Sequence, residues 1–536
     1  MRTRGVGGET MRPPSPAFAR TCTAVTLGAG LALAAAPAQA GTRDLGSGMS
    51  LDYAANLTYS LAMRTDDADP ELLANVNGDD GNRAFDKNAL INNRLALLAE
   101  GTFRYRQYGL VARGSAFYDD VYFHDSDNDS QATLNRGGRS DRFSDDARDR
   151  LGARARMLDL YAFAAVPVGN TALDIRAGNQ VVSWGESLYF PNTSGAQAPA
   201  DATKSNVPGT EVKEILLPTG QLFMQWGATD RLSLMGYWQW QWKGTELNPS
   251  DAFFSSSDLV GPGAESLLIP AFGLALPRAA DDKPGDDGQW GIGTRYRVGD
   301  ATEISLHYLR YNDKNPVGAN VLTAGGFPSG YQVVYTDDIK MTSASLSTEL
   351  LGTAVGAEVS YRQDAGVNIL VGSSPTPGRG DVIQGNFNLL KIFLPTRFWD
   401  TLVALGEVSY LHVTDTEALI VPTAGGPVAV DDLAGNHDAG ALQWSLQAGY
   451  QQVWAGWDLT WILVNGYGLE GTSPIAGALG SFTGKGDIRY SFGPTFKYLG
   501  NLEVGLAYNG YAGGASLARR PLADRSNAAF SIKYSF

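Results

Sequence analysis

Ala528-Ala529-Phe530-Ser531-Ile532-Lys533-Tyr534-Ser535-Phe536, the last nine residues of the 536-residue chain, decide the fold. Apolar side chains from Ala528 to Phe536 alternate strictly with small or polar ones. A period of two is typical of a β-strand whose two faces meet different surroundings. The machinery that assembles outer-membrane barrels recognises terminal aromatic strands of this kind. Phe536 therefore predicts that machinery as a partner and a transmembrane β-barrel as the fold.

The same alternation recurs upstream of this stretch. In the segment 232–243, Leu232, Leu234, Trp238, Trp240 and Trp242 alternate with Ser233, Tyr237, Gln239, Gln241 and Lys243. This parity places the three tryptophans against lipid, as an aromatic girdle. Other segments, roughly 9–13 residues long, suit a tilted strand that crosses a bilayer. They lie at 172–186, 354–362, 402–410, 442–451, 457–465 and 502–509.

The connections between these segments alternate in length. Short turns are expected near 106–109, 167–171, 229–231, 298–301, 351–353, 394–400, 453–456 and 498–501. Long polar loops are expected near 65–91, 119–155, 187–220, 244–288, 313–338, 364–380, 412–440, 466–485 and 511–525. This asymmetry predicts periplasmic turns and extracellular loops.

The segments between these connections predict an all-β, closed antiparallel barrel of about 18 strands. Weak segments at 221–228 and 382–393 leave 16 strands as the alternative. The barrel must close because lipid cannot satisfy the backbone groups of an open strand edge.

The N-terminal residues indicate export. Arg12 and Arg20 precede a short apolar run at 24–34, and Ala38-Gln39-Ala40 gives a small-x-small cleavage site. We expect a signal peptide at 1–40, a barrel at 41–536 and the outer membrane of a Gram-negative bacterium as the location. Cys22, the single cysteine, lies in the signal, which excludes disulfides and thiol chemistry from the barrel.

The charge balance excludes some partners. Four of the 42 basic and one of the 56 acidic residues lie in the signal, which leaves 38 and 55 and a net charge of −17. No basic run indicates nucleic-acid binding. Outer-membrane lipids and lipopolysaccharide are expected partners, the latter through divalent ions on acidic loops.

Catalytic and metal-binding patterns are weak. The four histidines form no serine–histidine–acid grouping, and no cofactor or metal-ligand cluster is apparent, so we do not expect an enzyme. The segment 125–129 begins like a calcium loop, but Ser130 replaces the turn glycine and Arg136 the bidentate glutamate. We interpret it as a solvated acidic loop, with weak surface calcium binding as the alternative.

Polar residues at inward positions are candidates for the lumen. Glu186, at the end of the segment 172–186, either latches the following loop or belongs to a pore constriction. The loop 187–220 carries a charged cluster and is expected to fold into the barrel and narrow it. Inward charges elsewhere, among them Glu100, Asp159 and Glu407, form a salt-bridged wall or set selectivity. The lumen and constriction candidates are Arg113, Arg176, Gln180, Trp184, Glu186, Glu211, Lys213, Glu214, Glu358 and Arg362.

The loop 244–288 is unusually apolar. Its apolar residues either pack onto other loops or form a greasy mouth for a hydrophobic substrate. They are Leu267, Leu268, Ile269, Phe272, Leu274 and Leu276.

Three stretches resemble a known family. They are Gly178-Asn179-Gln180-Val181-Val182-Ser183-Trp184-Gly185-Glu186-Ser187, Glu211-Val212-Lys213-Glu214-Ile215-Leu216-Leu217-Pro218 and Gly356-Ala357-Glu358-Val359-Ser360-Tyr361-Arg362. Together they resemble a proteobacterial family of large outer-membrane barrels catalogued as a domain of unknown function, type 1302. The resemblance covers nearly the whole chain after the signal. Asn179 departs from it, because a basic residue is expected there.

This resemblance implies a substrate class and a partner. Members are associated with hydrophobic compounds, including sterols and lipids, and often accompany RND-type exporters of the inner membrane. We therefore expect passive passage of hydrophobic or amphipathic molecules of lipid, sterol or aromatic type. The alternatives are a porin for polar solutes and a structural or adhesive barrel without transport.

Overall fold

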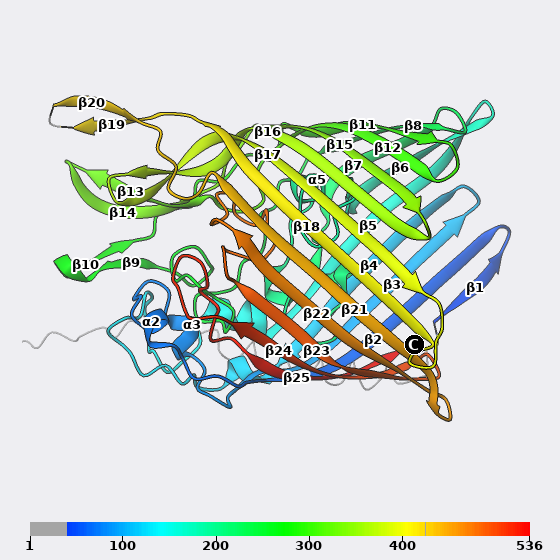
Figure 1. Ribbon diagram of the computed structural model, residues 1–536, viewed down its shortest axis with the longest axis horizontal. Coiled ribbons are helices and arrows are strands. Elements are labelled where there is room, and N and C mark those ends of the chain that lie inside the picture. The colour runs from blue at the N-terminus through cyan, green and yellow to red at the C-terminus, as the bar shows by residue number, and fades with distance from the viewer. Residues whose placement is uncertain (1–39, 424) are drawn as a thin grey trace, which may run out of the picture.

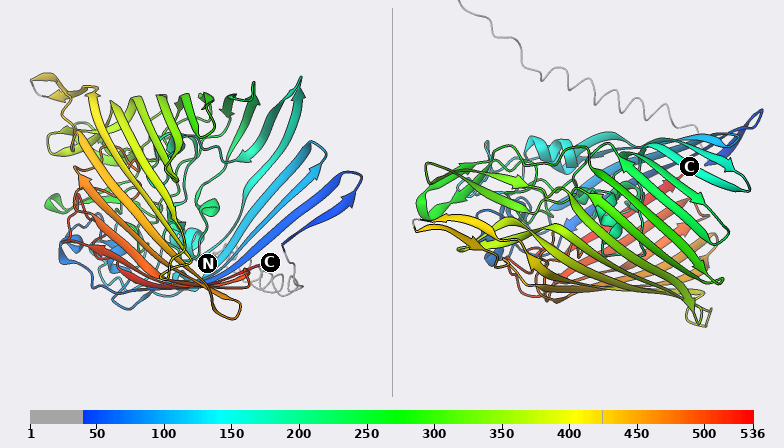
Figure 2. Two further views of the ribbon diagram at one scale, coloured as in Figure 1. Left: turned by 45° about the vertical axis from the view of Figure 1, so that its right-hand side comes forward. Right: turned by 90° about the horizontal axis from the view of Figure 1, so that it is seen from above.

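The computed structural model describes residues 40–423 and 425–536. The predicted signal peptide, 1–40, lies outside the described residues except for Ala40. The described chain forms one large antiparallel sheet that curls into a barrel (Figures 1 and 2). Within this part of the chain, no helix is both long and apolar enough to cross a membrane.

The main sheet has 19 strands, of which β1 (Gly41–Gly46) only forms a hairpin with the start of β2. The remaining 18 strands form the barrel wall, so the prediction of 18 rather than 16 strands is confirmed. They are β2 (Met49–Arg64), β3 (Leu90–Tyr105), β4 (Tyr108–Asp119), β5 (Ala153–Val168), β6 (Thr171–Gln180), β7 (Thr219–Gly227), β8 (Leu232–Gln239), β11 (Gln289–Val298), β12 (Thr302–Tyr311), β15 (Ile339–Leu350), β16 (Thr353–Val371), β17 (Ser374–Phe393), β18 (Thr401–Thr416), β21 (Asp438–Trp454), β22 (Trp457–Glu470), β23 (Ile488–Tyr498), β24 (Leu502–Ala512) and β25 (Asn527–Ser535).

The terminal strand closes this ring. β25 pairs with β24 on one side and with β2 on the other, where Leu57 lies opposite Tyr534. The amide of Phe536 donates to the carbonyl of Ala55 (2.8 Å). The closing strands therefore satisfy each other's backbone groups, as a wall surrounded by lipid requires.

Turn length differs between the two ends of the barrel. Short turns join the strands at the end where the C-terminus lies, and long loops join them at the other (Figure 1). Three hairpins extend from the long loops: β9 (Ser266–Ile269) with β10 (Leu274–Pro277), β13 (Gly318–Ala324) with β14 (Phe327–Val334), and β19 (Leu419–Thr423) with β20 (Gly426–Val430).

The helices are short and lie in the loops. They are α2 (Pro70–Leu73), α3 (Asp80–Arg83), α4 (Asp145–Ala147), α5 (Thr193–Gln197) and α6 (Val212–Ile215), with the 3₁₀ turns η1 (Asp120–Phe123), η3 (Ala202–Lys204) and η4 (Pro270–Phe272) and the π turn η2 (Arg148–Gly152). The apolar residues of the β8–β11 loop have both expected environments: Leu276 is buried, whereas Phe272 is exposed at the tip of the β9–β10 hairpin.

The outer face of the wall is apolar. Trp238 is 54% exposed, and Trp240, Ile292, Leu306 and Val359 are exposed with it. Inward positions carry buried polar side chains, which matches the predicted alternation.

The predicted girdle of three tryptophans was wrong for Trp242, which does not face lipid. It lies beyond the end of β8, where its ring packs edge-on against Tyr335 and its Nε1 donates to the carbonyl of Asp313 (3.0 Å). Trp238 and Trp240 face outward as predicted.

Two further element predictions were wrong. The segment 172–186 does not continue as a strand, because β6 ends at Gln180. The segment 364–380 is not a loop, because β16 and β17 continue as a hairpin past a bulge between Arg362 and Ala365. Beyond this bulge Val367 and Ile369 are fully buried in an apolar cluster with side chains of the other loops. This tertiary packing extends the two strands.

Candidate lumen constriction

The loop between β6 and β7, residues 181–218, crosses the inside of the barrel, and we call it the strap. Its two ends leave the wall side by side, because Gln180 and Thr219 are paired neighbours. Gln180 is fully buried there, and its side-chain Nε2 donates to the carbonyl of Gln221 (2.9 Å). Several of the candidate lumen residues contact this strap.

Glu358 of β16 is the first anchor. Its Oε2 accepts the backbone amides of Glu186 (2.7 Å) and Ser187 (3.3 Å), and its Oε1 accepts that of Thr193 (2.8 Å). The side chain is buried. Gly185, with φ +90°, lies so close to the carboxylate that a Cβ there would collide with it. The carboxylate thus accepts hydrogen bonds from a tight turn of the strap.

Glu407 of β18 is the second anchor. Its Oε2 accepts the backbone amides of Leu188 (3.0 Å), Tyr189 and Phe190 (3.3 Å). Asn386 of β17 donates both to Glu407 Oε1 and to the carbonyl of Phe190 (2.9 Å each). Two neighbouring carboxylates therefore hold consecutive turns of the strap against β16–β18.

Asn192 continues this contact with the wall. Its Oδ1 accepts Ser360 Oγ (2.5 Å) and Arg362 Nη2 (3.1 Å), while Arg362 also donates to Gln384 Oε1 (2.8 Å). These side chains are buried, so Arg362 binds the strap and does not project freely into the lumen.

The later part of the strap contacts the other side of the barrel. Glu211 accepts Asn56 Nδ2 of β2 (2.5 Å), and Lys213 pairs with Glu100 of β3 (3.0 Å). Glu214 is bound by Lys204 within the strap (3.2 Å). Five strands, β21–β25, separate β18 from β2 on one side of the ring, and seven separate β4 from β16 on the other. The strap therefore bridges nearly opposite walls.

Arg113 and Arg176 belong to the wall itself. Arg113 of β4 pairs with Glu100 (3.0 Å) and Asp159 (2.8 Å). These ion pairs fit the predicted salt-bridged wall. The guanidinium of Arg176 lies over the ring of Phe223, 4.4 Å from its centroid. These contacts stabilise the wall and support the strap indirectly.

Trp184 and Glu186 lie on the strap and not on a strand. The Trp184 ring stacks on His307 (5.2 Å) and meets Tyr237 edge-on (5.1 Å), inside the barrel. Glu186 contributes its backbone to the anchor: its amide binds Glu358, and its carbonyl accepts Asn388 Nδ2 (2.7 Å). The alternation in the sequence indicated inward positions, but it could not show that a backbone amide makes this contact.

A cavity of about 400 Å³ lies between the strap residues 205–209 and the wall formed by β21–β25. Phe254, Phe482, Arg489, Glu503 and Tyr511 are among its lining residues. Three other cavities next to the strap are far smaller, at about 20, 30 and 40 Å³.

The sequence spacing indicated no metal-ligand cluster, but the fold brings one acidic group together. Asp79 and Asp80 from the β2–β3 loop meet Asp258 from the β8–β11 loop. Nearly 180 residues separate them in sequence, so spacing alone could not show this group.

A closed barrel of 18 long antiparallel strands, apolar outside and polar inside, with loops at one end and short turns at the other, defines the class of outer-membrane channel-like β-barrels. Within this class the chain belongs to the DUF1302 family, described as proteins of unknown function, whose profile matches residues 21–536.

Solved structures with a similar course of the chain include two Occ proteins and OmpT, an outer membrane protein. OccK5 (OpdH) of Pseudomonas aeruginosa has 10% identity, covers 91% of this chain and 98% of its own, and gives a TM-score of 0.41. OccAB1 of Acinetobacter baumannii has 10% identity, 93% and 99% coverage, and a TM-score of 0.43. OmpT of Vibrio cholerae has 9% identity, 92% and 98% coverage, and a TM-score of 0.37. No curated protein matches the sequence.

Proposed function

We propose that this protein is a channel of the Gram-negative outer membrane through which hydrophobic or amphipathic small molecules pass without an energy source at that membrane. The observation that carries this proposal is the cavity between the strap and β21–β25. Its volume of about 400 Å³ lies within the range of pockets that hold small organic molecules, roughly 300–1,000 Å³.

The lining of this cavity combines two chemical characters. Phe254, Phe482 and Tyr511 supply aromatic surface, whereas Arg489 and Glu503 supply charge. The Arg489 guanidinium lies 5.0 Å from the Phe482 ring centroid and 5.4 Å from that of Tyr511, and it pairs with Asp487 (2.7 Å). A molecule with an apolar body and one polar group complements this surface better than a fully polar sugar does.

The direction of passage follows from the partner that the family resemblance implies. If an RND-type exporter delivers the molecule from the inner membrane, passage through the barrel is export. The strap then acts as a selective constriction across the barrel, with the β21–β25 side left as the route.

The second candidate is a porin for polar solutes. Polar side chains along the same wall favour it, because Gln443, Thr495, Asn509, Asn527 and Ser531 also line the cavity. The same route serves both candidates, so only the solute distinguishes them.

Uptake by proteoliposomes tests the proposed substrate class. We expect vesicles that contain the protein to take up a fluorescent sterol or fatty acid several-fold faster than empty vesicles, without swelling in sugars. Replacing Ser491, which lines the cavity, with tryptophan should slow this uptake. The control is Phe492→Trp, one residue further on and exposed on the outer face.

Three other results would change the assignment. Swelling in sugars without uptake of the amphiphile would assign the polar porin. No permeability to either solute would assign a barrel without transport. Equal inhibition by Ser491→Trp and Phe492→Trp would remove the route along β21–β25.

A further inference from the structure

Three aspartates meet in the loops at the end of the barrel away from the C-terminus (Figure 1). Asp79 and Asp80 lie at the start of α3 in the β2–β3 loop, and Asp258 lies in the β8–β11 loop. All three side chains are essentially inaccessible to solvent, and one ligand atom of each lies within 4.8 Å of the others. We call them the aspartate cluster.

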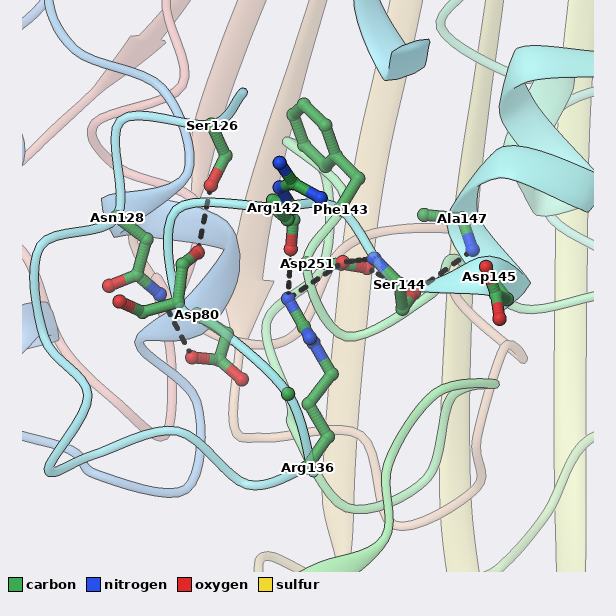
Figure 3. A network of polar contacts seen from close by, with 12 residues as sticks. Asp80, Ser126, Asn128, Arg136, Arg142, Phe143, Ser144, Asp145, Ala147 and Asp251 are labelled. Atoms are coloured by element: carbon green, nitrogen blue, oxygen red, sulfur yellow. Dashed lines mark hydrogen bonds and ion pairs between the residues drawn. The ribbon is translucent and has the colours of Figure 1, made fainter. Parts of the chain in front are cut away.

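Each carboxylate of the aspartate cluster has one partnered oxygen. Arg83 Nε donates to Asp79 Oδ2 (2.5 Å), Asn128 Nδ2 donates to Asp80 Oδ1 (3.2 Å; Figure 3), and the amide of Asp80 donates to Asp258 Oδ2 (3.1 Å).

The second oxygen of each carboxylate has no partner. Asp79 Oδ1, Asp80 Oδ2 and Asp258 Oδ1 are buried without a hydrogen-bond donor among the described residues. A buried carboxylate oxygen that loses its water without gaining a donor or a cation is strongly destabilising. Three such atoms in one cluster indicate a common positively charged ligand.

The neighbouring arginines do not supply this charge. Among the residues that the structure describes, Arg83 is the one that pairs with the cluster, while Arg136 pairs with Asp251 (3.5 Å; Figure 3) and Arg525 pairs with Asp524 (2.7 Å). When all three carboxylates are ionised, one guanidinium leaves an excess negative charge in a buried place. A divalent cation neutralises that excess.

We propose that the aspartate cluster binds one Ca²⁺ ion, which clamps the β2–β3 loop to the β8–β11 loop. Oxygen donors without histidine or cysteine select hard cations. Calcium accepts several carboxylates in irregular geometry and completes its shell with carbonyls and water, whereas Mg²⁺ needs near-ideal octahedral geometry. The two loops also pack backbone to backbone, since a Cβ on Gly81 would lie 2.5 Å from the carbonyl oxygen of Ala252.

The clamp has a structural consequence for the strap. The β8–β11 loop carries Glu246, whose carboxylate pairs with Arg154 (2.5 Å) and Arg156 (3.1 Å) of β5. The Glu246 backbone also exchanges hydrogen bonds with Ala200 and Ala202 of the strap (2.9 Å each). Bound calcium therefore stabilises the loop that holds the middle of the strap.

The calcium-like segment 125–129 contacts the edge of the aspartate cluster, because Asn128 Nδ2 donates to Asp80 Oδ1 (3.2 Å) and Asp129 lies 3.9 Å from Arg83 Nη1. Asp127 Oδ2 accepts the amide of Asp86 (2.8 Å), and the Asp129 side chain is 92% exposed. Asp67 provides the matched control: it is an exposed acid of the same β2–β3 loop, and it pairs with Lys87 (2.9 Å) and not with a member of the aspartate cluster or with Arg83.

Calorimetric titration of the full-length barrel, folded in detergent and stripped with a chelator, tests the proposal with Ca²⁺ itself as the probe. We expect one Ca²⁺ per chain, a higher unfolding temperature in calcium and slower proteolysis of the β8–β11 loop. Asp258→Asn should weaken binding more than about tenfold, and Asp67→Asn should leave it unchanged. If Asp258→Asn does not fold, Asp80→Asn replaces it, and the proteolysis of the unmodified protein still decides.

Three results would overturn the proposal. They are no saturable Ca²⁺ binding by the unmodified protein, an equal effect of Mg²⁺ at the same concentration, and loss of binding in Asp67→Asn with binding retained in Asp258→Asn. None of these results depends on whether the barrel transports a solute.

Discussion

At the scale of single residues, two carboxylates of the wall hold the strap by accepting hydrogen bonds from its backbone amides. Glu358 and Glu407 are buried in the wall and together accept six strap amides, those of residues 186–190 and 193. A carboxylate can accept several hydrogen bonds at once, and bonds to an ionised group are stronger than neutral ones. These two side chains therefore fix the path of the strap more than its own sequence does.

Glu407→Gln tests the second anchor. The amide lacks the charge and turns a donor toward backbone N–H groups, so we expect each lost charge-assisted bond to cost about 1.5–3 kcal/mol. A loosened strap should give a higher and noisier single-channel conductance in planar bilayers.

The matched control for this variant is Glu303→Gln. Glu303 pairs with Arg295 in the wall (2.9 Å) and, among the described residues, forms no hydrogen bond or ion pair with the strap. Equal conductance changes in both variants would show that wall charge, and not strap anchoring, controls the current.

At the scale of elements, the sequence predicted strands better than it predicted where strands end. Period-two alternation showed β25 and most of the wall, because one face meets an apolar medium and the other a polar interior. The alternation wrongly predicted that the strand β6 runs to Glu186. In the structure β6 ends at Gln180, Gly178 and Gly185 have positive φ values, and the chain turns inward after Gln180. Alternation shows which face of a strand is apolar, but it does not distinguish a strand from a loop that enters a polar interior.

The same limit applies to the candidate site. The residues Glu358, Arg362 and Glu407 were recognisable as inward charges, but their partners on the strap are mainly backbone groups and Asn192, which no pattern marks. The aspartate cluster was missed for a related reason, because its members come from two loops that only the folded barrel brings together.

The terminal strand provides a test at this scale. Deleting Phe536 removes the amide that binds Ala55 and the aromatic end of β25, so we expect several-fold less barrel with heat-modifiable mobility in outer-membrane fractions. The control is Phe492→Ala, which removes an outward-facing aromatic side chain from the middle of β23. This variant should assemble nearly normally. Equal yields of the two variants would contradict recognition of Phe536 by the assembly machinery.

At the scale of the whole molecule, a wide ring is divided by one loop. An 18-stranded barrel without such a loop encloses a broad aqueous channel. The strap bridges the β16–β18 wall and the β2–β4 wall, and the loops above it pack into an apolar cluster. The space that remains next to the strap is the cavity along β21–β25.

The central claim is that the strap narrows this channel, and the conductance of a barrel that lacks residues 192–208 tests it most directly. Because Gln180 and Thr219 are adjacent in the sheet, the shortened loop still joins β6 to β7. We predict a single-channel conductance several-fold above that of the complete chain, at the same salt concentration. An unchanged conductance, measured on a variant with the same heat-modifiable mobility, would contradict the account.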